Sequence, residues 1–200
     1  MFVPTPETFG LIALAREKIR ELGASSIADI GTGTGIIALA LANSFPDQRC
    51  FATDANETAL ELARYNADKN NILNVRSFRN DSLTWVSPQL PAPINLIVSN
   101  PPYIGNQEYT NPQFLQNYPE AAQEPQDAIR TYDEFGARPY VRILAESERL
   151  APTAYLFQCN TDNLCHLQEH LAPQGFQMST SPDHNGNDRF LFLQRKHKTD

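Results

Sequence analysis

The sequence predicts an α/β domain in which helices cover both faces of a mostly parallel sheet that ends in an antiparallel strand pair. Short apolar runs alternate with amphipathic stretches, which is the pattern of repeated strand–helix units. A glycine-rich turn follows the first apolar run, and the turn sequence Asp183-His184-Asn185-Gly186 joins two alternating segments near the end. The length suits a single domain, so we expect residues 1–200 to fold as one unit.

Seven strands are expected where apolar or β-branched runs end at turn residues: Ser26–Ile30, Arg49–Asp54, Val75–Phe78, Ile94–Ser99, Ala154–Cys159, Gln177–Ser181 and Arg189–Leu193. The fourth run is almost wholly apolar, as is usual for a parallel strand with both faces buried. Four helices are expected between the strands, the second of them capped by Asn56: Ile36–Phe45, Asn56–Lys69, Pro139–Leu150 and Asn163–Leu171.

A long segment from Asn100 to Asp133 shows no regular pattern and is rich in proline. Irregular loops of this length are uncommon inside a compact domain, and they usually have a binding or lid role. We therefore predict a lid, and we expect residues Gly105 to Ile129 to be mobile before a substrate binds.

The charge balance and the cysteines limit the class of protein. A formal charge of −7 argues against a long nucleic-acid footprint, because such binding needs several contacts that neutralise phosphates. No apolar stretch is long enough for a membrane span, and no secretory signal begins the chain, so a cytoplasmic location is expected. Cys50, Cys159 and Cys165 lack paired metal-ligand spacing, which predicts reduced thiols and no metal site.

The turn after the first strand carries three glycines at alternate positions. Glycine lets a ligand lie against the backbone, and the following helix start offers free N–H groups. A dinucleotide-binding turn places its third glycine one residue later, whereas this spacing fits a ligand with an amino-acid moiety and no pyrophosphate. A tight turn without a ligand is the alternative. The predicted cofactor-binding residues of the turn are Gly31, Thr32, Gly33, Thr34 and Gly35.

Acidic and hydroxyl side chains end the next two strands. Asp54 closes the second strand, where a carboxylate can accept hydrogen bonds from both ribose hydroxyls of a nucleoside lying across the sheet edge. A capping or turn role is the alternative for Asp54. Asp81 and Ser82 follow the third strand and are predicted to lie beside an adenine ring, although Asn80-Asp81-Ser82 is also a plain turn sequence.

The tetrapeptide Asn100-Pro101-Pro102-Tyr103 directly follows the buried fourth strand. Asn100 offers an amide oxygen, Pro101 offers a carbonyl, and Tyr103 offers a flat ring, which together suit a planar –NH2 group. The lone pair of such a nitrogen is delocalised, and drawing both N–H bonds toward fixed acceptors aims it at a methyl donor. We predict these four residues as catalytic, with Asn100 also touching the cofactor S-adenosyl-L-methionine, which leaves as S-adenosyl-L-homocysteine. A proline-rich turn with a packed tyrosine is the alternative.

Motifs along nearly the whole chain are shared with one family: Phe2–Thr8, the glycine turn, Asp54, Asn100–Ile104, Glu124-Pro125 and Asp183–Arg189. On these motifs the sequence resembles the HemK/PrmC-type protein-(glutamine-N5) methyltransferases, which modify the Gly-Gly-Gln motif of peptide-chain release factors. The resemblance implies a single Rossmann-like class I methyltransferase domain with a seven-stranded sheet. It also implies that the glycine turn, Asp54 and Ser82 bind cofactor, while Asn100 to Tyr103 hold the glutamine.

Three features depart from this family. The chain starts after the position of the family's N-terminal helical domain. Tyr118–Gln123 replaces the usual run before Glu-Pro, and Gln158-Cys159-Asn160 stands where the family tends to read Glu-Ile-Gly. The shared motifs outweigh these departures, so the leading hypothesis is a protein glutamine methyltransferase acting on a release factor or a similar translation protein.

Other functions remain open at this point. An adenine N6-methyltransferase of RNA or DNA is the nearest rival, because the same tetrapeptide suits that amino group. An inactive cofactor-binding module is a second alternative, against which the intact Asn100 and glycine turn count. A NAD-dependent oxidoreductase would leave Asn100 to Tyr103 without a role.

Overall fold

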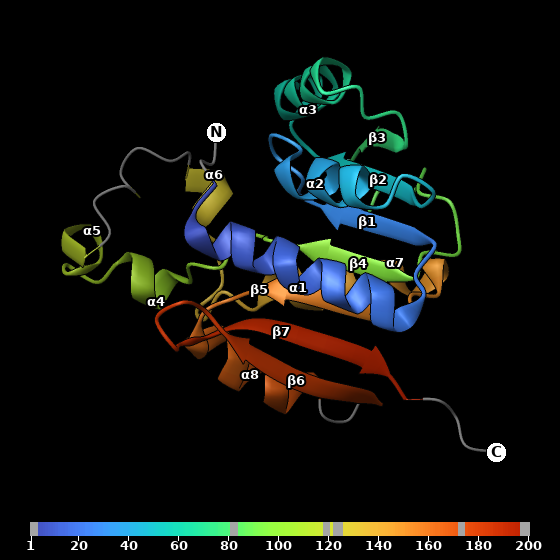
Figure 1. Ribbon diagram of the computed structural model, residues 1–200. Helices are drawn as coiled ribbons and strands as arrows, with labels where there is room; N and C mark the ends of the chain where they lie inside the picture. The colour runs from blue at the N-terminus through green and yellow to red at the C-terminus, as the bar shows by residue number, and fades with distance from the viewer. Residues whose placement is uncertain (1–3, 81–83, 118–120, 122–125, 172–174, 197–200) are drawn as a thin grey trace.

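A computed structural model of the chain describes residues 4–80, 84–117, 121, 126–171 and 175–196. Its seven strands form one sheet in the order β3-β2-β1-β4-β5-β7-β6 (Figure 1). The strands are β1 Ser26–Ile30, β2 Arg49–Asp54, β3 Val75–Arg79, β4 Leu96–Ser99, β5 Ala154–Gln158, β6 Phe176–Pro182 and β7 Asp188–Arg195. The first five strands pair in parallel, and β7 runs antiparallel between β5 and β6. The predicted fold class is confirmed.

Helices lie on both faces of the sheet and along one of its edges (Figure 1). The longer helices are α1 Pro6–Leu22, α2 Ile36–Ser44, α3 Glu57–Lys69, α7 Arg138–Ser147 and α8 Thr161–Leu171. Three single-turn helices, α4 Asn106–Tyr109, α5 Phe114–Asn117 and α6 Gln126–Ile129, lie in the segment expected to be irregular, and the 3-10 turn η2 Glu148–Leu150 extends α7.

The differences from the predicted elements have local causes. Strand β4 begins at Leu96 rather than Ile94, because the N–H of Ile94 donates outside the sheet, to the Leu150 carbonyl. The helix α1 was not predicted. It begins at Pro6, directly after the cap residue Thr5. Proline is favoured at this first position because its missing N–H would have no helical partner, and the Thr5 N–H donates to the Thr8 hydroxyl.

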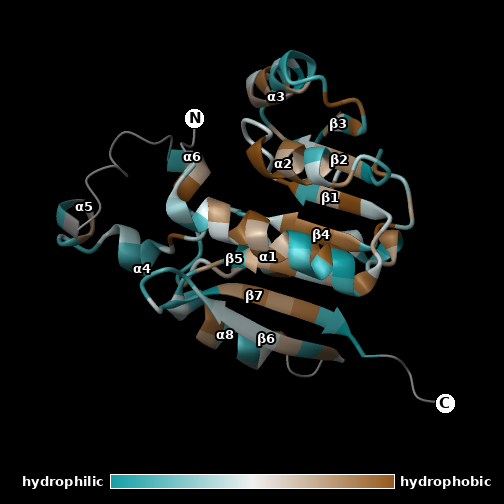
Figure 2. Ribbon diagram, in the orientation of Figure 1, coloured by the Kyte–Doolittle hydropathy of each residue, from teal (hydrophilic) through white to brown (hydrophobic). Residues whose placement is uncertain are grey.

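Two apolar cores lie on opposite faces of the central strands. Figure 2 shows that these strands consist largely of hydrophobic residues. Side chains alternate along β4, so Leu96 and Val98 join the core under α1 and α2, while Ile97 joins the core under α7 and α8. All three are fully buried, which stabilises the fold by roughly 1.5–3 kcal/mol for each side chain of this size. These cores hold β1 and β4 rigidly in the middle of the sheet.

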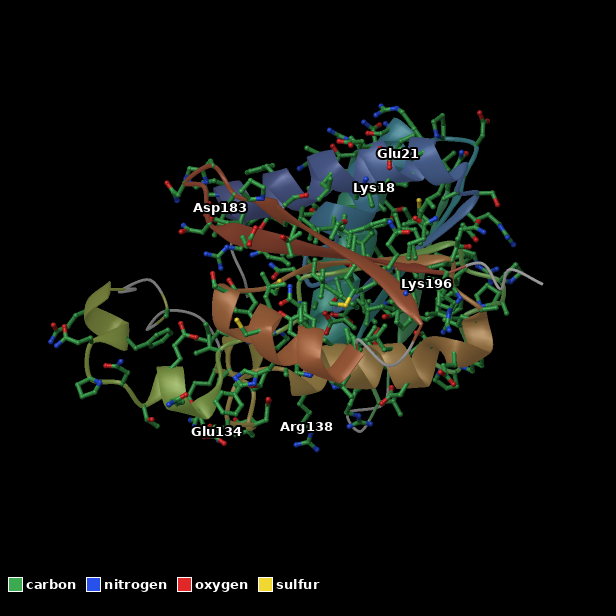
Figure 3. The ribbon with its side chains drawn as sticks, turned by 90° about the horizontal axis from the view of Figure 1, so that it is seen from below. Lys18, Glu21, Glu134, Arg138, Asp183 and Lys196 are labelled. Atoms are coloured by element: carbon green, nitrogen blue, oxygen red, sulfur yellow. The ribbon has the colours of Figure 1, made fainter. Side chains whose placement is uncertain are left out.

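The outer surface carries the charges (Figure 3). On α1, Lys18 and Glu21 form an exposed ion pair with an N–O distance of 2.7 Å, an interaction that adds little stability in water. Within the described part of the chain, no helix is long and apolar enough to span a membrane.

The strand order defines where a ligand would bind. From β1 the chain continues to β2 and β3 on one side, and β4 and β5 lie on the other side. In sheets of this kind the crevice opens outside the carboxyl ends of the two strands where the order reverses, which here are β1 and β4. Helices α4, α5 and α6 and the first turn of α1 all lie toward this edge (Figure 1).

Candidate active site

The glycine turn connects β1 to α2 and leaves part of its backbone open. Gly31, Gly33 and Gly35 have φ values of +74°, +54° and +84°, a region that favours glycine. A Cβ atom added to Gly31 or Gly33 would meet nothing within 4 Å, whereas one added to Gly35 would lie 2.9 Å from the Cβ of Ala63 on α3. The first two glycines therefore keep a surface open, and the third lets α3 pack closely.

The carboxyl group of Asp29 lies buried beneath this turn. Its Oδ2 accepts hydrogen bonds from the Thr32 hydroxyl at 2.6 Å and from the Ala38 N–H at 3.1 Å, while its Oδ1 has no partner. The Thr32 side chain is thus engaged within the protein, and the Thr34 carbonyl accepts from the Asn66 amide at 3.0 Å. Burial raises the pKa of the Asp29 carboxyl to about 7, although both hydrogen bonds act in the opposite direction.

This shift predicts a pH dependence of stability. Between pH 3.8 and about 7 the unfolded chain releases the Asp29 proton while the folded chain keeps it, so the free energy of unfolding falls as the pH rises. Asp29→Asn keeps an acceptor oxygen but cannot titrate. In urea unfolding at about pH 5 and about pH 8, we expect wild type to lose roughly 2 kcal/mol more than the variant. Identical losses would contradict the raised pKa.

Asp54 lies at the end of β2 and contacts the glycine turn directly. Its Oδ2 accepts from the Gly33 N–H at 2.9 Å, and its Oδ1 accepts from the Asn56 N–H at 2.9 Å. Each oxygen of a carboxylate can accept more than one hydrogen bond, and the residue is partly exposed. The glycine turn and Asp54, which a helix and a strand separate in the sequence, are therefore adjacent in space. The Asp54 carboxylate can still accept hydrogen bonds from a ligand. The other predicted residues here, Asp81 and Ser82, lie outside the described residues.

Asn100 follows β4 and lies beside the open glycines. The register pairs Val98 with Asp29, and the Ser99 hydroxyl donates to the Ile30 carbonyl at 2.6 Å, which brings Asn100 next to Gly31. The Oδ1 atom of Asn100 is buried and has no hydrogen-bond partner among the residues that the structure describes. A buried polar atom without a partner is costly, and most such atoms in folded proteins are paired. The orphan acceptor therefore marks a place where a donor group of a ligand would fit.

The remaining residues of the tetrapeptide are held by the body of the protein. Pro101 is buried, and Pro102 and Tyr103 are half-buried. The Tyr103 carbonyl accepts from the Asn163 amide of α8 at 3.1 Å. Burial raises the pKa of the Tyr103 hydroxyl, and the Arg189 charge and a hydrogen bond with the Gln158 side chain partly oppose the shift. Tyr103 therefore stays neutral near pH 7, as a stacking surface requires.

The segment predicted as an irregular lid contains more structure than expected. Ile104 and Arg130 form a parallel bridge, and the Asn106 N–H donates to the Asp133 carbonyl at 2.8 Å. The Arg130 guanidinium lies 4.4 Å from the centre of the Tyr109 ring and donates to the Asn106 side chain. These contacts join residues of one segment, which explains why the segment has regular structure. The mobility of residues 105–129 before substrate binding stays a prediction. Glu124-Pro125 and most of Tyr118–Gln123 lie outside the described residues.

Two further parts of the chain reach the same edge. Thr8, in the first turn of α1, is fully buried, and Phe190 of β7 packs against Gly10. The turn between β6 and β7 is built on Asp183, whose Oδ1 accepts from the N–H groups of Asn185 and Asn187. Sequence reasoning assigned these motifs only through resemblance. The N-terminal Thr-Pro was the one local signal of a helix start.

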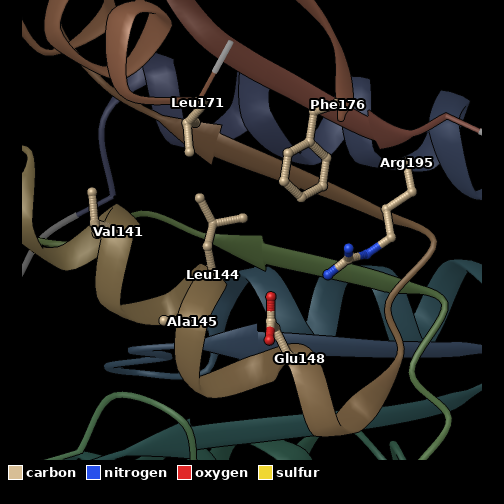
Figure 4. A pocket seen from close by; sticks show the side chains of 7 residues that line it. All are labelled: Val141, Leu144, Ala145, Glu148, Leu171, Phe176 and Arg195. Carbon is tan, nitrogen blue, oxygen red and sulfur yellow. The ribbon is translucent and has the colours of Figure 1, made fainter. Parts of the chain in front are cut away.

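A separate hollow lies at the other end of the sheet, beside the carboxyl end of β7 and the start of β6 (Figure 4). Its volume is about 520 Å³, and the Glu148 carboxylate and the Arg195 guanidinium both point into it. Its lining residues are Val141, Leu144, Ala145, Glu148, Leu171, Phe176 and Arg195. Arg195 lies near the amino end of β5, so this hollow is at the opposite end of the sheet from the glycine turn. No residue predicted to be functional lines it. The cysteines are unpaired, as expected from their spacing.

Comparison with known proteins places the chain among methyltransferases. A curated release factor glutamine methyltransferase from Deinococcus radiodurans is 35% identical over 196 residues, which cover 96% of this chain and 66% of that protein. One from Aliivibrio fischeri is 32% identical over 94% of this chain and 64% of that protein. The chain thus spans slightly less than two thirds of these relatives. They confirm the predicted resemblance.

Solved structures show the same fold at low identity. The catalytic domain of hMettl16 in complex with the MAT2A 3'UTR hairpin 1 superposes with a TM-score of 0.74 at 18% identity, covering 98% of this chain and 72% of that chain. A methyltransferase from Pyrococcus furiosus gives a TM-score of 0.67 at 18% identity, covering 98% and 85%. The family model described as Methyltransferase small domain matches residues 13–124. Because that match spans more than half of its length, the chain belongs to the methyltransferase small domain family.

Proposed function

We propose that the chain transfers a methyl group from S-adenosylmethionine to the side-chain amide nitrogen of a glutamine in a protein. The proposed acceptor is the Gly-Gly-Gln motif of a peptide-chain release factor, and residues 1–200 act as the catalytic domain. One observation carries the proposal. The buried, unpartnered Oδ1 of Asn100 lies beside the open backbone of Gly31, so that an –NH2 acceptor and a cofactor would meet there.

The residues at the sheet edge fit the proposed cofactor. Gly31 and Gly33 offer backbone with free space in front of it, and Asp54 has acceptor capacity beyond its two backbone hydrogen bonds. We assign the amino-acid moiety to the glycine turn and the ribose to Asp54. A structure of the N-terminal domain of human METTL16, which shares the fold, holds SAH, which supports S-adenosylmethionine as the cofactor.

The chain's own residues would prepare the acceptor nitrogen. When bound, the cofactor supplies an electrophilic methyl group on a positively charged sulfur. Asn100 and the Pro101 carbonyl would accept the two N–H hydrogens, and Tyr103 would stack on the planar amide. Fixing both N–H bonds favours a pyramidal nitrogen whose lone pair points at the methyl group. No strong base is needed, because the nitrogen can lose its proton after transfer.

The names of the curated relatives favour a release factor over a nucleic acid as acceptor. The net charge of −7 agrees with this choice. Although the hMettl16 structure holds an RNA hairpin, identity of 18% shows a common fold only.

A labelling experiment tests the function. The chain is incubated with isotopically labelled S-adenosylmethionine and, separately, with a bacterial release factor, tRNA, rRNA or DNA, and mass spectrometry locates the label. We expect label on the glutamine of the Gly-Gly-Gln motif. A release factor carrying alanine in place of that glutamine is the control and should remain unlabelled. Label on adenine, or on no acceptor, would refute the proposal.

A further inference from the structure

Gln158 is a second buried amide at the carboxyl edge of the sheet. It is the last residue of β5, and only 1% of its surface is exposed. Within the described part of the chain, its Oε1 has no hydrogen-bond partner. Its backbone carbonyl is occupied by the Tyr140 hydroxyl at 2.9 Å, so only the side chain remains available. Burying an amide oxygen without a partner destabilises a fold, which makes this side chain a candidate for contact with a ligand.

The sheet register brings Gln158 beside Asn100. Strands β4 and β5 are parallel, with Ser99 opposite Phe157, and the residues that directly follow these two are Asn100 and Gln158. Phe157 packs into the core under α7 and α8, whereas Leu156 packs into the core under α1 and α2. Because side chains alternate along a strand, Gln158 faces the α1 side. Leu96 and Val98 also face the α1 side, and continuing this alternation by two residues places Asn100 on the same face.

The surroundings of Gln158 belong to the same site. Its neighbour on β7 is Phe190, which packs against Gly10 of α1. Hydrogen bonding between the Gln158 side chain and the Tyr103 hydroxyl influences the pKa of Tyr103. Gln158 thus contacts the predicted stacking ring, and the unpartnered oxygens of Gln158 and Asn100 are both amide oxygens.

We propose that Gln158 is a specificity-determining residue for the acceptor group, with its Oε1 receiving an N–H of the –NH2 group that Asn100 also holds. This inference rests on the proposed function. The second N–H of the acceptor group would be shared between the Pro101 carbonyl and the Oε1 of Gln158. Two neutral amide oxygens on adjacent strands attract an –NH2 group and repel a carboxylate, so the pair would select glutamine over glutamate. In the family that the sequence resembles, this position tends to carry Glu, whose carboxylate oxygens also accept hydrogen bonds.

Two variants of Gln158 separate an acceptor from a packing role. Gln158→Met keeps the size but removes the acceptor, and Gln158→Glu restores an acceptor oxygen. Assayed with a bacterial release factor, Gln158→Met should raise the KM for that protein about 10-fold and leave kcat within about threefold, because the Pro101 carbonyl still directs the shared N–H during transfer. Gln158→Glu should recover most of the wild-type KM. Gln177→Met, an exposed position on β6, is the matched control and should change neither value.

Cofactor affinity distinguishes the outcomes. The Kd for S-adenosylmethionine, measured by calorimetry, should stay within about twofold in all variants, since Gln158 is not assigned to the cofactor. If wild type methylates the release factor and Gln158→Met keeps the wild-type KM, the Gln158 assignment is overturned while the function stands. Equal loss in Gln158→Met and Gln158→Glu also overturns it, because packing alone would then explain the effect. A wild-type chain that transfers no label overturns the proposed function and this inference with it.

Discussion

Replacing Asn100 by alanine is expected to lower turnover by about two to three orders of magnitude, while the Kd for S-adenosylmethionine stays within about threefold. The Oδ1 of Asn100, next to the glycine turn, is a buried acceptor without a partner among the described residues. Its removal leaves one N–H of the acceptor amide undirected, so the nitrogen lone pair stays delocalised. The backbone of the glycine turn does not depend on the Asn100 side chain, which is why cofactor affinity should persist.

The measurement pairs single-turnover kinetics with calorimetry on the same preparation. Asn43→Ala is the matched control, because Asn43 is exposed on α2 and lies outside the site. Full activity in Asn100→Ala would refute the model in which two acceptors direct the amide. A large increase in the cofactor Kd would instead indicate that Asn100 binds the cofactor rather than the acceptor amide.

Replacing Asp54 by alanine is expected to raise the Kd for S-adenosylmethionine by about 10- to 100-fold, the effect of losing hydrogen bonds to a charged group. The substitution removes the assigned ribose acceptor, and it also frees the Gly33 N–H from its 2.9 Å hydrogen bond. Both changes affect groups assigned to the cofactor, so the KM for the acceptor protein should change less than the Kd for the cofactor.

The controls for Asp54 separate charge from structure. Asp54→Asn keeps one acceptor oxygen and should bind the cofactor more tightly than Asp54→Ala. Asp47→Ala removes an exposed carboxylate before β2 and should leave the Kd unchanged. Urea unfolding of each variant shows whether the fold persists. An unchanged cofactor Kd in a folded Asp54→Ala protein would discard the ribose assignment.

Local pattern was enough to predict most of the secondary structure. Strands β1 and β2 have the predicted bounds, and α3 follows its Asn56 cap, whose Oδ1 accepts from the Thr58 N–H at 3.0 Å. Strand periodicity and a capping residue are signals within a few residues of the element they define. The single-turn helices α4, α5 and α6 gave no such signal. Four residues are too few to show a helical period, and so short a helix depends on tertiary contacts.

The sequence alone determined the fold class, the open glycine turn and the chemical type of the acceptor tetrapeptide, because each depends on residues that are close together along the chain. Only the tertiary structure decided which polar groups are already in use. It engages the Thr32 hydroxyl with Asp29 and the Gly33 N–H with Asp54, and it leaves the amide oxygens of Asn100 and Gln158 without partners. Hydrogen-bond partners distant in sequence are set by strand order and register, which no local pattern encodes.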